Sequence, residues 1–120
     1  MSKFIESDNW EDFLKEFSGR NQKRRARFNI FFSSGETVEE GEEGHLEKVS
    51  LDQNAGKKSV VISRTDQSGE SADTMTDTIE GVRGLAVQYE TDGSENILEI
   101  TDEKNTLFSL RFESKLDGNS

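Results

Sequence analysis

The sequence contains no cysteine and no proline among its 120 residues. Without cysteine, the protein forms no disulfide, thiol nucleophile, iron–sulfur cluster or cysteine-based zinc site. No segment reaches the roughly 20 apolar residues that a transmembrane helix needs, and no signal-peptide pattern follows the first methionine. We therefore expect a cytoplasmic protein that makes no contact with a membrane.

Apolar residues make up only 30% of the chain, although eight phenylalanines supply large hydrophobic side chains. Acidic residues outnumber basic residues by 25 to 15, which gives a formal net charge of −10. An overall negative field repels nucleic-acid backbones and anionic membrane surfaces. A chain of this length typically forms one domain, so we expect residues 1–120 to share a single compact core.

One helix is predicted near the N-terminus. Four apolar residues recur there at helical spacing, namely Trp10, Phe13, Leu14 and Phe17. The pattern predicts a helix over about residues 9–18, ended by Gly19. So short a helix is marginal alone in water, which favours its apolar stripe as part of the core over a surface for a partner.

Beyond residue 20 the apolar period changes from 3.6 to 2, which is typical of strands. Six segments show it, at about 27–33, 45–52, 58–64, 84–91, 96–102 and 106–113. In the second segment Leu46 is out of phase with Val49, which predicts a β-bulge or a twist. The stretch 65–77 is polar and is expected to be a loop.

Short strands joined by turns predict an antiparallel meander, and a single helix covers only part of such a sheet. The expected fold is α+β: one N-terminal helix packed on a curled antiparallel sheet, or on a small partly open barrel, of five or six strands. Four aromatic residues are expected to fill its interior, namely Phe28, Phe32, Phe108 and Phe112. Phe31 alternates with them and is expected to face outward.

The sharpest charge feature is a basic segment in this acidic chain, formed by Arg20, Lys23, Arg24, Arg25 and Arg27. These five residues are the candidate binding residues, for RNA, DNA or an acidic partner. Alternatively, the segment is a solvated connection between helix and strand that pairs with nearby glutamates. An exposed Phe31 could stack on bases, whereas the net charge disfavours nucleic acid.

No catalytic or metal-binding constellation is evident. His45, the only histidine, lies near Glu42, Glu43 and Glu47, which suggests either a carboxylate–histidine site or, as we favour, an exposed residue. The acidic stretches 35–44 and 66–73 lack the ligand spacing of an EF-hand. Phosphate-binding loops and nucleophile elbows are absent from the sequence. We therefore predict no enzymatic activity, no metal and no cofactor.

Several hydrophobic segments carry a family resemblance, namely Trp10–Ser18, Thr78–Val82, Ile97–Ile100 and Leu107–Phe112. In these the chain resembles an uncharacterised bacterial domain-of-unknown-function family over about residues 9–118. It departs from that family in lacking a proline at residues 79–82. The resemblance implies no activity, ligand or site residue. In fold alone, a short helix before curled strands also resembles Sm-like RNA-binding barrels.

Three functional hypotheses remain open at this point. The leading one is a non-enzymatic protein-interaction or regulatory module that binds another protein through its loops. The alternative is RNA binding through the basic segment on an Sm-like barrel. A third, a barrel for a small ligand, requires a deep apolar cavity. Exposed edge strands can pair while the net charge opposes association, so we expect a monomer or a weak homo-oligomer.

Overall fold

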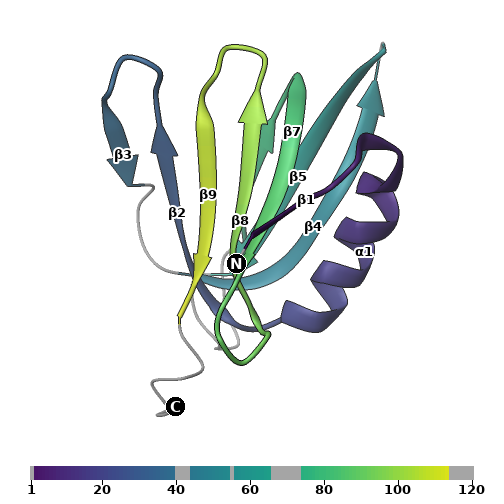
Figure 1. The fold of residues 1–120 in the computed structure, drawn as a ribbon, viewed down its shortest axis with the longest axis vertical. Helices are drawn as coiled ribbons and strands as arrows, with labels where there is room; N and C mark the ends of the chain where they lie inside the picture. The colour runs from purple at the N-terminus through teal and green to yellow at the C-terminus, as the bar shows by residue number, and fades with distance from the viewer. Residues whose placement is uncertain (1, 40–43, 55, 66–73, 114–120) are drawn as a thin grey trace.

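The computed structural model describes residues 2–39, 44–54, 56–65 and 74–113 (Figure 1). A 3₁₀ turn (Ser7–Asn9) leads into the helix α1 (Trp10–Asn21). The strands are β1 (Ser2–Phe4), β2 (Arg25–Phe31), β3 (Thr37–Glu39), β4 (Gly44–Asn54), β5 (Lys57–Thr65), β6 (Thr74–Ile79), β7 (Val82–Tyr89), β8 (Glu95–Asp102) and β9 (Leu107–Phe112).

All strands belong to one antiparallel sheet in the order β1-β7-β8-β9-β2-β4-β5-β6, with β3 paired to β2. The expected α+β class and the curled antiparallel sheet are confirmed, and the sheet is not closed into a barrel. The predicted number of strands was wrong, because the described residues form nine strands rather than five or six.

The three strands that were not predicted are β1, β3 and β6, and none of them shows a recognisable alternation of apolar residues. Both β1 and β3 contain only three residues. The strand β6 begins at Thr74, inside the stretch 65–77 that was expected to be a loop, and its alternate threonines are exposed. Residues 66–73 of that stretch lie outside the described part of the chain.

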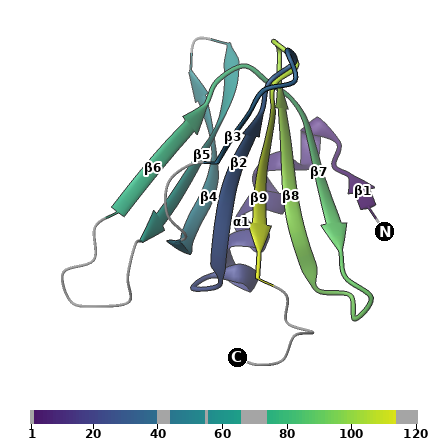
Figure 2. The same cartoon turned by 90° about the vertical axis from the view of Figure 1, so that its left-hand side faces the viewer.

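The curl of the sheet arises where β2 changes its neighbour. Arg25 and Ala26 pair with β4, whereas Asn29–Phe31 pair with β3. Beyond this junction β4 turns away from β2, and α1 lies against the edge of β4 that is left (Figure 1). Figure 2 shows the result: β4, β5 and β6 form one side of a wedge, and β2, β9, β8 and β7 form the other.

The helix covers the inner face of this wedge with its apolar stripe. Trp10, Leu14 and Phe17 are buried, and Phe13 is half-buried against the same core. The ring of Phe17 lies 5.6 Å from that of Phe112 on β9, measured between centroids. The prediction that this stripe belongs to the core is confirmed.

The strand β4 contains the β-bulge that the sequence predicts, between Leu46 and Lys48. The extra residue shifts the alternation, so that both Leu46 and Val49 point into the core. It also turns the backbone of Val49 towards α1. There the Ser18 hydroxyl accepts from the Val49 N–H at 2.8 Å and lies 2.8 Å from the Val49 carbonyl oxygen. The Ser18 side chain thus takes the hydrogen-bonding role that a neighbouring strand would have at this edge of β4.

We expect Ser18→Ala to lower the free energy of unfolding by about 1–3 kcal/mol, because it leaves the Val49 backbone groups without a partner against the helix. Urea denaturation followed by Trp10 fluorescence measures the loss. The matched control is Ser50→Ala, another serine of the groove between α1 and β4, with an expected change below about 0.5 kcal/mol. Equal losses in the two variants would contradict the assigned role of Ser18.

The helix extends beyond the predicted C-terminus. Gly19 lies inside α1 rather than after it, the helix ends at Asn21, and Lys23 in the connection beyond it has a φ of 73°. The cause is a tertiary contact, because the Asn21 side chain donates to the Phe17 carbonyl and to Glu95 on β8. A local pattern cannot reveal such a partner.

Candidate functional site

The structure divides the basic segment into two groups. Arg20 and Arg24 point towards β8, where the side chain of Glu95 is only 7% exposed. Arg20 donates from Nε to Glu95 Oε1 at 3.0 Å and from Nη2 to Oε2 at 2.7 Å, which is a bidentate ion pair. The hydrogen bond to Glu95 raises the pKa of Arg20.

Asn21 and Arg24 complete this contact. Asn21 Nδ2 donates to Glu95 Oε1 at 2.8 Å, and Arg24 Nη1 donates to Asn21 Oδ1 at 2.9 Å and to the Glu95 carbonyl at 2.7 Å. The Arg24 guanidinium also lies 4.5 Å from the centre of the Phe112 ring. Burial lowers the pKa of Arg24. We call Arg20, Asn21, Arg24 and Glu95 the Glu95 network, and it joins the end of α1 to β8 and β9.

The remaining basic residues lie elsewhere. Arg25 and Arg27 are exposed on the outer face of β2, and Lys23 is exposed in the connection before it. Arg25 Nε lies 3.8 Å from the Glu113 carboxylate, and Arg27 stands opposite Arg111 of β9. The structure therefore does not bring the five candidate binding residues together on one surface.

Among the described residues, the most exposed large apolar side chains outside β1 gather at the end of the β2–β3 hairpin. Phe31 is 39% exposed, Phe32 is 40% exposed and Val38 is 42% exposed. Val38 pairs with Ile30 and Phe31 pairs with Thr37, so Phe31 and Val38 lie on opposite faces of the hairpin. We call Phe31, Phe32 and Val38 the hairpin tip.

The outward position of Phe31 agrees with the prediction, but the inward position predicted for Phe32 was wrong. The strand β2 ends at Phe31, and Phe32 begins the turn: its N–H donates to the Glu36 carbonyl, and its carbonyl accepts from Gly35. Gly35 takes a φ of 98° there. The serines and glycine that follow Phe32 are the sequence signal that could have located this turn.

The interior is filled by the other aromatic residues of the predicted set. Phe28 is buried and stacks on Phe108 with 6.1 Å between ring centres. Phe112 is buried against Phe17. A deep apolar cavity, the requirement of the small-ligand hypothesis, has no support from these contacts.

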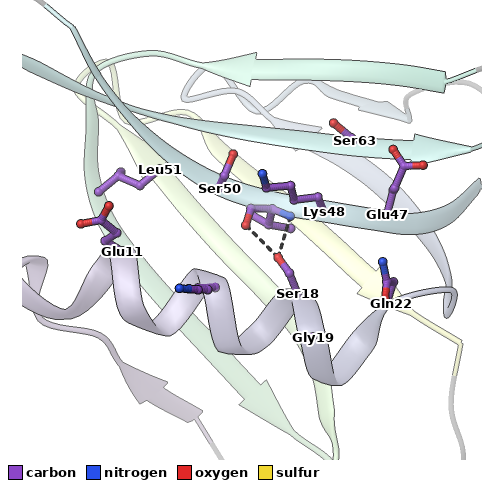
Figure 3. A pocket seen from close by; sticks show the side chains of 11 residues that line it. Glu11, Ser18, Gly19, Gln22, Glu47, Lys48, Ser50, Leu51 and Ser63 are labelled. Atoms are coloured by element: carbon purple, nitrogen blue, oxygen red, sulfur yellow. Dashed lines mark hydrogen bonds between the residues drawn. The ribbon is translucent and has the colours of Figure 1, made fainter.

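A groove of about 510 Å³ runs between α1 and β4 (Figure 3). Charges of both signs line it, with Glu11 and Lys15 on the helix and Glu47 and Lys48 on the strand. The hydroxyl of Ser18 is hydrogen-bonded to the backbone of Val49, and the residues that line the groove include no histidine. The groove therefore offers volume but no pair of nucleophile and base.

His45 lies on β4, half-buried between Arg25 and Thr65 in the sheet. Two of its predicted neighbours, Glu42 and Glu43, lie outside the described residues, as does the whole of the second acidic stretch, 66–73. Within the described ranges, no group of three or more histidine, cysteine, aspartate or glutamate side chains is arranged to hold a metal ion. In the same ranges, no helix has the length and apolar character to cross a membrane.

Comparison with models of known families, with curated proteins and with solved structures finds no match to this chain. The resemblance to an uncharacterised bacterial family therefore stays a prediction. The case for a function rests on the surface chemistry described above.

Proposed function

We propose that this protein is a non-enzymatic protein-interaction module and that the hairpin tip is its contact surface. The observation that carries the proposal is the exposure of three large apolar side chains within one hairpin, at 39% for Phe31, 40% for Phe32 and 42% for Val38. Isolated surface hydrophobics are common, but grouped ones mark interaction sites. Aromatic side chains are also frequent energetic anchors of interfaces.

The shape of the hairpin tip favours a particular kind of partner. Because apolar side chains lie on both faces and in the turn, the tip suits a concave pocket that surrounds it. Glu36 is exposed in the turn of the same hairpin, and the whole chain carries a net charge of −10. The best-matched partner is therefore a protein with an apolar pocket and a basic rim.

RNA binding is the alternative function, and one arrangement favours it. Arg25, Arg27 and Phe31 lie on the same outer face of β2, which combines cations with an aromatic ring. Two contacts weigh against it. Glu113 lies beside Arg25, and the Glu95 network already engages Arg20 and Arg24. We favour the hairpin tip, because the exposure of three large apolar side chains to water does not stabilise the fold, whereas the arginines already have partners within the chain.

The test is the double variant Phe31→Ser/Phe32→Ser. Affinity capture of the full chain from its native host is expected to recover at least about tenfold less partner with this variant than with the wild type, because two aromatic anchors are lost. Each side chain is only about two-fifths exposed, so we expect the double variant to lose about 2–3 kcal/mol in the free energy of unfolding and to remain folded.

Phe4→Ser is the matched control, since Phe4 is 65% exposed but lies on β1, away from the hairpin tip. It is expected to leave the capture unchanged. Undiminished capture by a folded Phe31→Ser/Phe32→Ser protein would refute the proposed surface. A loss shared by Phe4→Ser would show that exposed phenylalanines bind without specificity.

A further inference from the structure

The strand β6 forms an open edge of the sheet. It pairs with β5 residue for residue over Thr74–Ile79, with no bulge, and stands last in the strand order. Figure 2 shows it as the outermost strand on its side of the wedge. No backbone hydrogen bond from another described residue reaches its outer side.

The backbone groups of β6 that face outward can be deduced from the hydrogen bonds of Ser18. They show that the Val49 N–H and C=O point away from β5. Since Val49 stands opposite Ile62, and Ile62 opposite Asp77, the alternation directs the backbone groups of Ile62 and Asp77 towards each other. By the same alternation, three residues of β6 direct their N–H and C=O groups outward, namely Thr74, Thr76 and Thr78.

This edge lacks most of the features by which proteins prevent strand pairing. It has no lysine, no proline and no bulge, and its alternate threonines favour extended structure. Its one charge, Asp77, lies on the inner face within 3.5 Å of Arg64 Nη2. An ion pair of this kind reduces the cost of covering the Asp77 carboxylate with a second strand.

We infer that β6 pairs with β6 of a second copy of this chain. Only residues whose backbone N–H and C=O groups point away from β5 can form hydrogen bonds to the second copy. The two-fold antiparallel register with the largest overlap therefore places Thr76 opposite Thr76. Thr74 then faces Thr78, and Met75 faces Asp77. These are favourable threonine pairs without like charges directly opposite each other. A second copy fits because the segment is complementary to itself.

The inference goes beyond the proposed function, because it uses a surface other than the hairpin tip. A dimer formed at β6 leaves both hairpin tips available and presents two of them to a partner. The edges β1 and β3 are weaker candidates, since each has three residues against six in β6. A contact of one strand is small, so the dimer is weak and depends on protein concentration.

Salt is expected to strengthen the dimer. Each copy carries a net charge of −10, so two copies repel each other at low ionic strength. Screening shortens the range of this repulsion, from about 30 Å at 0.01 M salt to about 8 Å at physiological ionic strength. The dissociation constant should therefore fall as salt rises, opposite to the trend for RNA binding.

Sedimentation equilibrium of the full chain over a range of protein and salt concentrations tests the inference. We expect a monomer–dimer equilibrium that Thr76→Pro weakens about tenfold or more, because the proline removes both central hydrogen bonds. The Thr76 N–H faces outward, so its removal spares the pairing with β5. Thr76→Val keeps the N–H and the branched side chain, and is expected to dimerise like the wild type.

Hydrogen exchange of the wild-type chain provides a test that does not depend on a variant. The amide of Thr76 should become more protected as protein concentration rises, while the Asp77 amide, bonded to β5, should not change. A chain that stays monomeric at all concentrations would overturn the inference. So would a dimer that Thr76→Pro leaves intact, or one that leaves the Thr76 amide exchanging at its monomer rate.

Discussion

Replacement of Glu95 by alanine is expected to lower the free energy of unfolding by about 2–4 kcal/mol. The Glu95 carboxylate accepts from Arg20 at 2.7 Å and from Asn21 at 2.8 Å in a position that is 7% exposed. Its removal leaves the buried Asn21 amide without this acceptor and disturbs its bond from Arg24. Arg20 is about half exposed and can turn to water, so the loss falls below that of a fully buried pair. Urea denaturation measures it.

Two controls separate the Glu95 network from ordinary surface charge. Glu95→Gln keeps one carbonyl acceptor and is expected to lose less stability than Glu95→Ala. Glu16→Ala removes the exposed carboxylate that lies 3.7 Å from Arg20, and should cost less than about 0.5 kcal/mol. A Glu95→Ala protein as stable as the Glu16→Ala protein would mean that the network does not hold α1 to β8.

Phe17→Ala is expected to lower the free energy of unfolding by about 3–5 kcal/mol, because it opens a cavity where the helix meets the sheet. The Phe17 side chain is fully buried, and its ring lies 5.6 Å from Phe112 and 5.7 Å from Phe13. Neither α1 nor the sheet can close this space without losing other core contacts. Urea or thermal denaturation of the purified protein gives the value.

Phe13→Ala is the comparison within the same apolar stripe. Phe13 is only half-buried, so its loss is expected to be clearly smaller than that of Phe17. Losses of the same size at both positions would be inconsistent with the side of α1 assigned to the core.

The elements predictable from sequence were those in which burial imposes a period. The helix stripe and the six predicted strands each have one buried face, so large side chains recur at a spacing that can be recognised. The bulge in β4 was also predictable, because both Leu46 and Val49 must enter the core although they are three residues apart.

Features that depend on distant partners were not predictable. The end of α1 depends on Glu95, which lies 74 residues after Asn21 in the chain. The same contact directs Arg20 and Arg24 away from a shared basic surface. The threonines of β6 face water on the outer face of the sheet, so this segment has no run of alternating apolar residues that would indicate a strand.

Part of the candidate site could be predicted and part could not. Phe31 was expected to face outward because it alternates with Phe28. Phe32 was misplaced because the alternation was extended through a turn that begins at Phe32 itself. Val38 lies on a strand of three residues, too short for a pattern to place it.

The most direct test of the proposed function is photo-cross-linking in the native host, with a photoreactive phenylalanine analogue at position 32 and, separately, at position 4. We expect a discrete protein adduct from position 32, its loss when Phe31→Ser is added, and no adduct from position 4. An RNA adduct from position 32, or no adduct there at all, would contradict the claim that the hairpin tip binds a protein partner.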